Sequence, residues 1–164
     1  MRFCKTNLKA AGTAAMVIIA VAALLVFLLF RPGKEVLILK DGESGKIYAK
    51  YEANQGMTFS VSFIHSVNKT RVKEAYEIKD GAIYLESCLY SDFGAGVATE
   101  VEEGQSLTYT EDGEMFLSGF NRRIEGLSYI VGTVSDHILE IDGEEISLRD
   151  LCGRNSTVRF EVVK

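Results

Sequence analysis

The chain has 164 residues, a net charge of −5 and 47% hydrophobic residues. This length supports one domain with a substantial core rather than two. Its mild acidity argues against nucleic acid as a partner, because nucleic-acid-binding proteins usually carry a basic patch.

The apolar residues are concentrated near the N-terminus. Residues 10–30 contain no charged side chain, and a helix of that length, at about 1.5 Å per residue, can cross the roughly 30 Å hydrocarbon layer. The run exceeds the roughly 7–15 apolar residues of a signal peptide, and it ends in "LLFRPG" without a small-residue cleavage pattern. We therefore predict one uncleaved transmembrane signal anchor.

The charges around this run predict its orientation. Arg2, Lys5 and Lys9 precede it, and the positive-inside rule then keeps the N-terminus in the cytoplasm, although Arg31 and Lys34 reduce the asymmetry. We expect a single-pass protein of the cell membrane with an extracytoplasmic C-terminal domain. Its predicted parts are a cytoplasmic N-terminus (1–9), the anchor (10–30), a linker (31–35) and an exported β-domain (36–164).

The exported part is predicted to be all-β, an antiparallel sandwich or a partly open barrel. Apolar runs of strand length alternate with turns, and four turns contain Asp-Gly, which favours the tight type I′ hairpin. We expect a short helical turn within Glu145–Leu151. The predicted strands are Val36–Lys40, Lys46–Glu52, Met57–His65, Val72–Ile78, Ile83–Tyr90, Ser106–Thr110, Met115–Phe120, Leu127–Val131, His137–Ile141 and Val158–Val163.

One of these hairpins predicts a strand register. If Asp80 and Gly81 form a two-residue loop, Ile78 faces Ile83 and Glu74 faces Ser87 further along. The same register places Cys88 on the face opposite to Glu74. His65 ends the preceding strand and is expected opposite or diagonal to Glu74, within reach of its carboxylate.

This arrangement gives a polar cluster on an otherwise apolar face. A buried carboxylate needs hydrogen-bond donors, so the simplest interpretation is a structural group that fixes the strand register. The alternative is a ligand site, because titratable groups with shifted pKa values collect at functional sites. Gly94 and Gly96, in the loop after the third strand of the cluster, are candidates for an anion-binding backbone.

Three segments, "FIHSVNKTRVKEAYEI", "FGAG" and "HILEI", resemble a bacterial family catalogued as domain of unknown function eighteen-fifty. The resemblance extends over about residues 36–163. It implies a small protein with an N-terminal hydrophobic segment, encoded beside TRAP-type transporters that use TAXI-class solute receptors. It implies no reaction. The candidate residues for a ligand site or a structural polar cluster are His65, Ser66, Glu74, Ser87, Gly94, Gly96 and His137.

Three classes of function follow. The first is an accessory protein of a TRAP-type transporter, attached to the membrane by its N-terminal helix and contacting membrane subunits or the solute receptor; it needs no cofactor. The second is a metal-dependent hydrolase using His65, Glu74 and His137, which are suitable zinc ligands but lack a metal-binding spacing. The third is a sortase-like thiol transpeptidase using Cys152. A Cys88–Cys152 disulfide and two free thiols are both compatible with the exported location.

Overall fold

The structure is a computed structural model that describes residues 16, 19–22, 35–67, 69–91 and 101–164. Residues 34–164 form one compact unit. The predicted anchor at 10–30 lies outside the described residues except for Met16 and residues 19–22, which are helical. Within the described residues, no helix is both long and apolar enough to cross a membrane.

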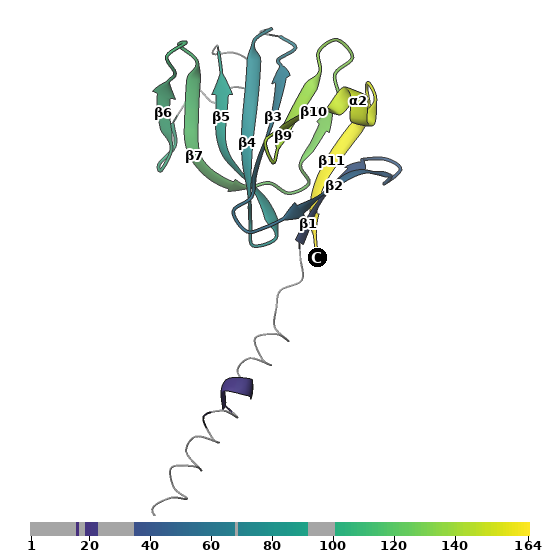
Figure 1. Cartoon of the computed structure of the whole chain (residues 1–164). Coiled ribbons are helices and arrows are strands. Elements are labelled where there is room, and N and C mark those ends of the chain that lie inside the picture. The colour runs from purple at the N-terminus through teal and green to yellow at the C-terminus, as the bar shows by residue number, and fades with distance from the viewer. Residues whose placement is uncertain (1–15, 17–18, 23–34, 68, 92–100) are drawn as a thin grey trace, which may run out of the picture. The chain divides into compact units, whose positions relative to one another are not determined.

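The compact unit consists of two antiparallel sheets and one short helix (Figure 1), and its described strands do not close into a barrel. The smaller sheet has the order β2–β1–β11–β8, with β1 (Glu35–Asp41), β2 (Ile47–Ala53), β8 (Ser128–Ile130) and β11 (Thr157–Val163). The larger sheet has the order β10–β9–β3–β4–β5–β7–β6. Its strands are β3 (Thr58–Ile64), β4 (Arg71–Lys79), β5 (Ala82–Tyr90), β6 (Ser106–Tyr109), β7 (Met115–Arg123), β9 (His137–Ile141) and β10 (Glu144–Ser147).

The core lies between the two sheets, because alternate residues of each strand point toward the other sheet. Leu37 and Leu39 of β1 and Phe160 of β11 are almost fully buried from one side, and Phe59 and Val61 of β3 from the other. Phe160 stacks on Phe59 with ring centroids 5.6 Å apart. This alternation confirms the all-β prediction and explains why a chain with few helical patterns forms two facing sheets.

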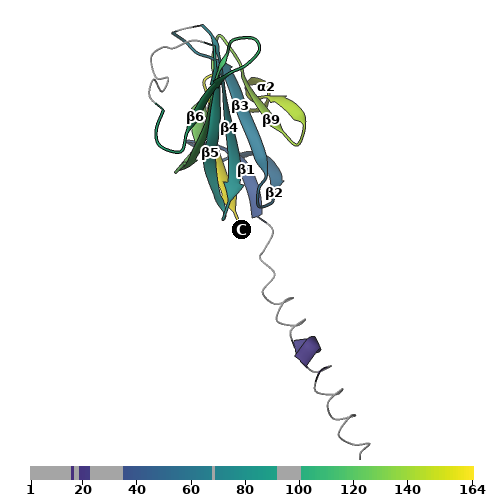
Figure 2. The same cartoon turned by 90° about the vertical axis from the view of Figure 1, so that its left-hand side faces the viewer.

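The two ends of the domain lie together. Val36, near the start of β1, pairs with Val163, near the end of β11, and both views show the C-terminus beside the start of β1 (Figures 1 and 2). The β4–β5 turn lies at the same end, since an added Cβ at Gly81 would be 3.0 Å from a carboxylate oxygen of Glu35. The β3–β4 turn is therefore at the opposite end of the larger sheet.

Every predicted strand is present, with boundaries shifted by up to three residues. The Asp80-Gly81 turn has positive φ at both residues (50° and 72°), as does Asp142-Gly143 (52° and 78°), which confirms the tight hairpins expected there. The Asp41-Gly42 turn differs. Its φ values are not positive; instead, the Asp41 carboxylate accepts hydrogen bonds from the backbone N–H groups of Glu43 and Ser44.

The prediction of a helical turn over Glu145–Leu151 is partly wrong. Residues Glu144–Ser147 form β10 against β9, and the helix α2 (Leu148–Cys152) begins only after them. The side chain of Ser147 caps this helix by accepting a hydrogen bond from the N–H of Asp150. Residues 144–147 thus form a strand whose last residue also caps the following helix. The local sequence does not show where the strand ends and the helix begins.

Candidate functional site

A carboxylate and two tyrosines meet between the sheets. Glu74 and Tyr76 lie on β4 of the larger sheet, and Tyr129 lies on β8 of the smaller one. The Tyr129 hydroxyl donates to Glu74 Oε2 at 2.5 Å, and the Tyr76 hydroxyl lies 3.1 Å from the same oxygen. The two hydroxyl oxygens are 2.6 Å apart. We call these three residues the inner cluster; it is a hydrogen-bonded connection between the two sheets.

Aromatic rings surround the inner cluster. Tyr76 stacks on Phe59 at 5.2 Å between ring centroids, and Tyr129 meets Phe160 edge-on at 6.0 Å. Tyr76 is only 3% exposed, while Glu74 is partly buried. The carboxylate is therefore held at the margin of an apolar core, with its donors supplied by phenol groups rather than by cations.

His137 lies on the same side of the larger sheet. It begins β9, opposite Phe63 of β3, and its ring stacks on Phe63 at 5.0 Å and lies 5.7 Å from the ring of Tyr129. Its Nδ1 accepts a hydrogen bond from the N–H of Gly132, so the neutral ring carries its proton on Nε2. Burial lowers the pKa of His137, although the nearby Asp136 and Glu74 carboxylates oppose this shift.

The loop before His137 is fixed by Asp136. Its carboxylate accepts from the backbone N–H groups of His137 and Arg149 and from the hydroxyl of Ser147. Burial raises the pKa of Asp136, but these hydrogen bonds outweigh that effect and lower it overall. The imidazole of His137 is consequently positioned by the first turn of α2 and the end of β10, both distant from β4 in the sequence.

The two tyrosines and the thiol beside Glu74 keep their protons at neutral pH. Burial is the main reason that the pKa values of Tyr76 and Tyr129 are raised, and the carboxylate of Glu74 adds to the effect. Burial and the same carboxylate raise the pKa of Cys88 to about 12. The arrangement is suited to holding a carboxylate by hydrogen bonds. It does not favour a thiolate or phenolate nucleophile, because burial and the charge of Glu74 outweigh the opposing effects of Tyr129 on Tyr76 and of Arg122 on Cys88.

The structure contradicts the predicted pairing of His65 with Glu74. Val61 is opposite Glu74 in the β3–β4 register, and His65 follows it by four residues, or roughly 13 Å along an extended strand. β3 ends at Ile64, and His65 and Ser66 lie in the turn that follows. The prediction was wrong because the loop length between the strands does not define which residues pair.

The prediction that Ser87 lies beside Glu74 is also wrong. Tyr76 pairs with Leu85 as expected, but Ala75 pairs with Ser87 and Glu74 with Cys88. Glu86 is an extra residue at this point, and the β5–β7 register shifts at the same place. A β-bulge of this kind reverses the faces of all later residues. Cys88 therefore faces the core beside Glu74, where the sequence had predicted Ser87.

The remaining candidate residues are two loop glycines and two cysteines. Gly94 and Gly96 lie outside the described residues. Cys88 and Cys152 are free thiols. Burial, followed by the charge of Asp41, raises the pKa of Cys152 to about 11, which disfavours the thiolate that a sortase-like reaction would need. In the described part of the chain, no three His, Cys, Asp or Glu side chains are grouped so as to hold a metal ion.

Sequence reasoning missed the role of Tyr129. Its strand has only three residues and belongs to the other sheet, so no hairpin register connects it to Glu74. The only available signal was that Glu74 needs a donor. A partner more than fifty residues away, on a strand without a tight turn to its neighbour, cannot be identified from that requirement alone.

Comparison with known proteins identifies a family. A family model described as "Domain of unknown function (DUF1850)" matches residues 59–148, which extend from β3 to the first residue of α2 and include Glu74, Tyr76, Tyr129 and His137. No curated protein and no solved structure matches the chain.

Proposed function

Since the chain belongs to the DUF1850 family, a family with no assigned reaction, we propose that it is a membrane-anchored, extracytoplasmic binding domain that assists a TRAP-type solute transporter. In this proposal residues 10–30 are the anchor, and the two packed sheets form a sandwich outside the membrane. The partners are the transporter's membrane subunits or its solute receptor. The chemistry is association rather than catalysis.

The observation that carries the anchoring part is the uncharged run itself. Residues 10–30 are long enough to span the bilayer, and the first strand of the domain begins at Glu35. Residues 31–34 are too short to form a further domain, so the sandwich would remain close to the membrane surface. An accessory subunit that must stay beside membrane subunits benefits from this, because tethering raises its effective concentration at the partner.

The chemistry of the inner cluster supports a binding role over an enzymatic one. Glu74 accepts from two tyrosine hydroxyls, and the pKa values of the neighbouring tyrosines and thiol are raised. General bases and nucleophiles are activated by the opposite change, a pKa brought toward the working pH. In this proposal the inner cluster has a structural role, and the outer surfaces of the domain bind the transporter subunits.

A complementation experiment tests this proposal. We expect deletion of the gene to reduce uptake of the solute of the neighbouring transporter, and the full chain to restore it. Residues 34–164 exported by a cleavable signal should restore uptake only at much higher expression, because they lack the tether. Normal uptake in the deletion strain contradicts the accessory role. Full restoration by the untethered domain at equal expression contradicts the need for anchoring.

Topology is a separate test of the same proposal. Protease added to intact spheroplasts should remove residues 34–164 while leaving a fragment that contains residues 10–30 in the membrane. A shorter, freely released form whose N-terminus lies near residue 31 would show cleavage instead of anchoring. A domain protected from protease until the membrane is broken would reverse the predicted orientation.

A further inference from the structure

The outer face of the larger sheet, which points away from the smaller sheet, carries a groove of about 650 Å³. It is bounded by the β2–β3 turn at residues 54–57 and the β9–β10 turn at residues 142–143. Thr58 and Ser60 of β3, Lys73 of β4 and Glu140 of β9 line it. This volume is within the usual range for small-molecule sites. It is distinct from the inner cluster, whose residues face the core.

The groove contains an ion pair, Lys73 with Glu140, whose hydrogen-bond donors and acceptors are not all occupied. Lys73 Nζ is 2.5 Å from Glu140 Oε2, and the Ser60 hydroxyl donates to the same oxygen at 3.3 Å. Ser60 is 7% exposed although it points away from the core, so its hydroxyl is a fixed part of the groove. Hydrogen bonds from Lys73 and then Ser60 lower the pKa of Glu140, so Glu140 is ionised at neutral pH.

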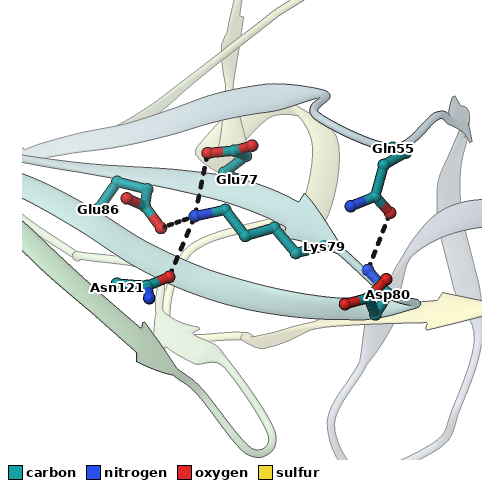
Figure 3. A network of polar contacts seen from close by, with 6 residues as sticks. All are labelled: Gln55, Glu77, Lys79, Asp80, Glu86 and Asn121. Atoms are coloured by element: carbon teal, nitrogen blue, oxygen red, sulfur yellow. Dashed lines mark hydrogen bonds and ion pairs between the residues drawn. The ribbon is translucent and has the colours of Figure 1, made fainter.

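A second ion pair on the same face contains a lysine whose three ammonium donors all have acceptors. Lys79 Nζ contacts Glu86 at 2.7 Å, Asn121 at 3.1 Å and Glu77 at 3.3 Å (Figure 3). An ammonium has three donors, and Lys79 has an acceptor for each. Lys73 has one acceptor among the described residues, and its side chain is 30% exposed. Two of its donors therefore remain available to a ligand.

The Glu140 carboxylate also has an oxygen available, as an acceptor. The Glu140 side chain is 46% exposed, and its described hydrogen bonds all involve Oε2, so Oε1 can accept from a ligand. The groove thus offers two donors and one acceptor of opposite charge on neighbouring strands. A ligand with a single charge would satisfy one partner and compete with the other. A ligand with an ammonium and a carboxylate attached to the same carbon atom would satisfy both.

We infer that this groove binds a small zwitterion of the α-amino acid class. The ligand's carboxylate accepts from the two available donors of Lys73, and its ammonium donates to Glu140 Oε1. Ser60 keeps the Glu140 carboxylate in place. The side chain of the ligand lies over Ala75 and toward the turn at residues 54–57, which also line the groove. This site does not depend on the transporter proposal.

Equilibrium dialysis of the full chain in detergent micelles tests the inference. The probes are radiolabelled glycine, alanine, serine and glutamine, with acetate and methylammonium as singly charged competitors. We expect saturable binding of at least one of the four amino acids. Lys73→Met and Glu140→Gln should each weaken it by about tenfold or more, since each removes a charge-assisted hydrogen bond.

The Lys79 ion pair supplies matched controls. Lys79→Met and Glu86→Gln alter charges on the same face but outside the groove, and they should change the affinity by less than about twofold. Melting temperatures of all four variants confirm folding, and the two groove variants test the site independently. The inference is overturned if none of the four amino acids binds saturably. It is equally overturned if both groove variants bind like the wild type, or if acetate or methylammonium alone competes as well as the amino acid.

Discussion

Glu74 inside the domain and Glu86 on its surface are carboxylates on paired strands of one sheet, yet they are held in different ways. Glu74 accepts hydrogen bonds from neutral tyrosines, one of which belongs to the opposite sheet. Glu86 shares Lys79 with Glu77 and Asn121, all on one face of the larger sheet (Figure 3). The inner cluster thus joins two layers, whereas the outer network joins strands that are already hydrogen-bonded.

This difference has an energetic consequence. Surface ion pairs contribute little, because water solvates both charges when the pair is broken. A hydrogen bond to a partly buried carboxylate contributes more, because its loss leaves a polar group without a partner in the core. The domain should therefore depend strongly on the few polar contacts of the inner cluster and weakly on the more visible charges outside.

Removing the inner carboxylate should have the largest effect. We expect Glu74→Ala to lower the free energy of unfolding by about 3 kcal/mol, since two hydrogen bonds to a charged acceptor are lost together. Glu86→Ala, the matched change outside, should cost less than about 1 kcal/mol. Urea unfolding of the two variants measures both values. Equal losses would show that the location of the carboxylate does not matter.

Removing only the cross-sheet donor should have an intermediate effect. Tyr129→Phe keeps the ring contacts with Phe160 and His137 but removes the hydroxyl that donates to Glu74. We expect a loss of about 2 kcal/mol in urea unfolding. Tyr109→Phe is the control, because Tyr109 is 63% exposed and should tolerate the change. A Tyr129→Phe variant as stable as the control would mean that the connection between the sheets contributes nothing.

Protonation of His137 should make the folded protein less stable as the pH falls. Its pKa is lower in the folded protein than its ordinary value of about 6.5, so the unfolded chain binds a proton more readily. The stabilising effect of the neutral imidazole is complete above about pH 6.5 and is lost as the pH falls below it. Urea unfolding measured at about pH 7.5 and at about pH 5.5 tests this. The free energy of unfolding should decrease less between these two pH values for His137→Gln than for the wild type. An identical decrease in the two proteins would assign the effect to another group.

Breaking the outer network should have the smallest effect. The Lys79 side chain is 26% exposed and that of Glu86 28%, so both remain accessible to solvent. We expect Lys79→Met to cost about 0.5–1 kcal/mol at low salt and less at 1 M salt, where charges are screened over about 3 Å. The measurement is urea unfolding at the two salt concentrations. A larger loss that persists at high salt would show that this network, too, is structurally important.

The positions of the strands were determined by the sequence itself. Alternating apolar residues and Asp-Gly turns act over short distances, so the strands, the Asp80-Gly81 and Asp142-Gly143 hairpins and the pairing of Ile78 with Ile83 could all be predicted. The importance of Glu74 as a carboxylate on an apolar face followed from the same alternation. The anchor over residues 10–30 remains a prediction.

The partners of Glu74 were decided only by the tertiary structure. Because of the bulge at Glu86, Cys88 rather than Ser87 lies beside the carboxylate of Glu74. Because β3 and β4 pair only as far as Ile64 and Arg71, His65 lies beyond the end of the paired strands. Tyr129 and His137 approach from strands whose neighbours are fixed by the whole topology. Local patterns determine which residues form strands and turns, but a partner across two sheets is set by the packing of the entire core.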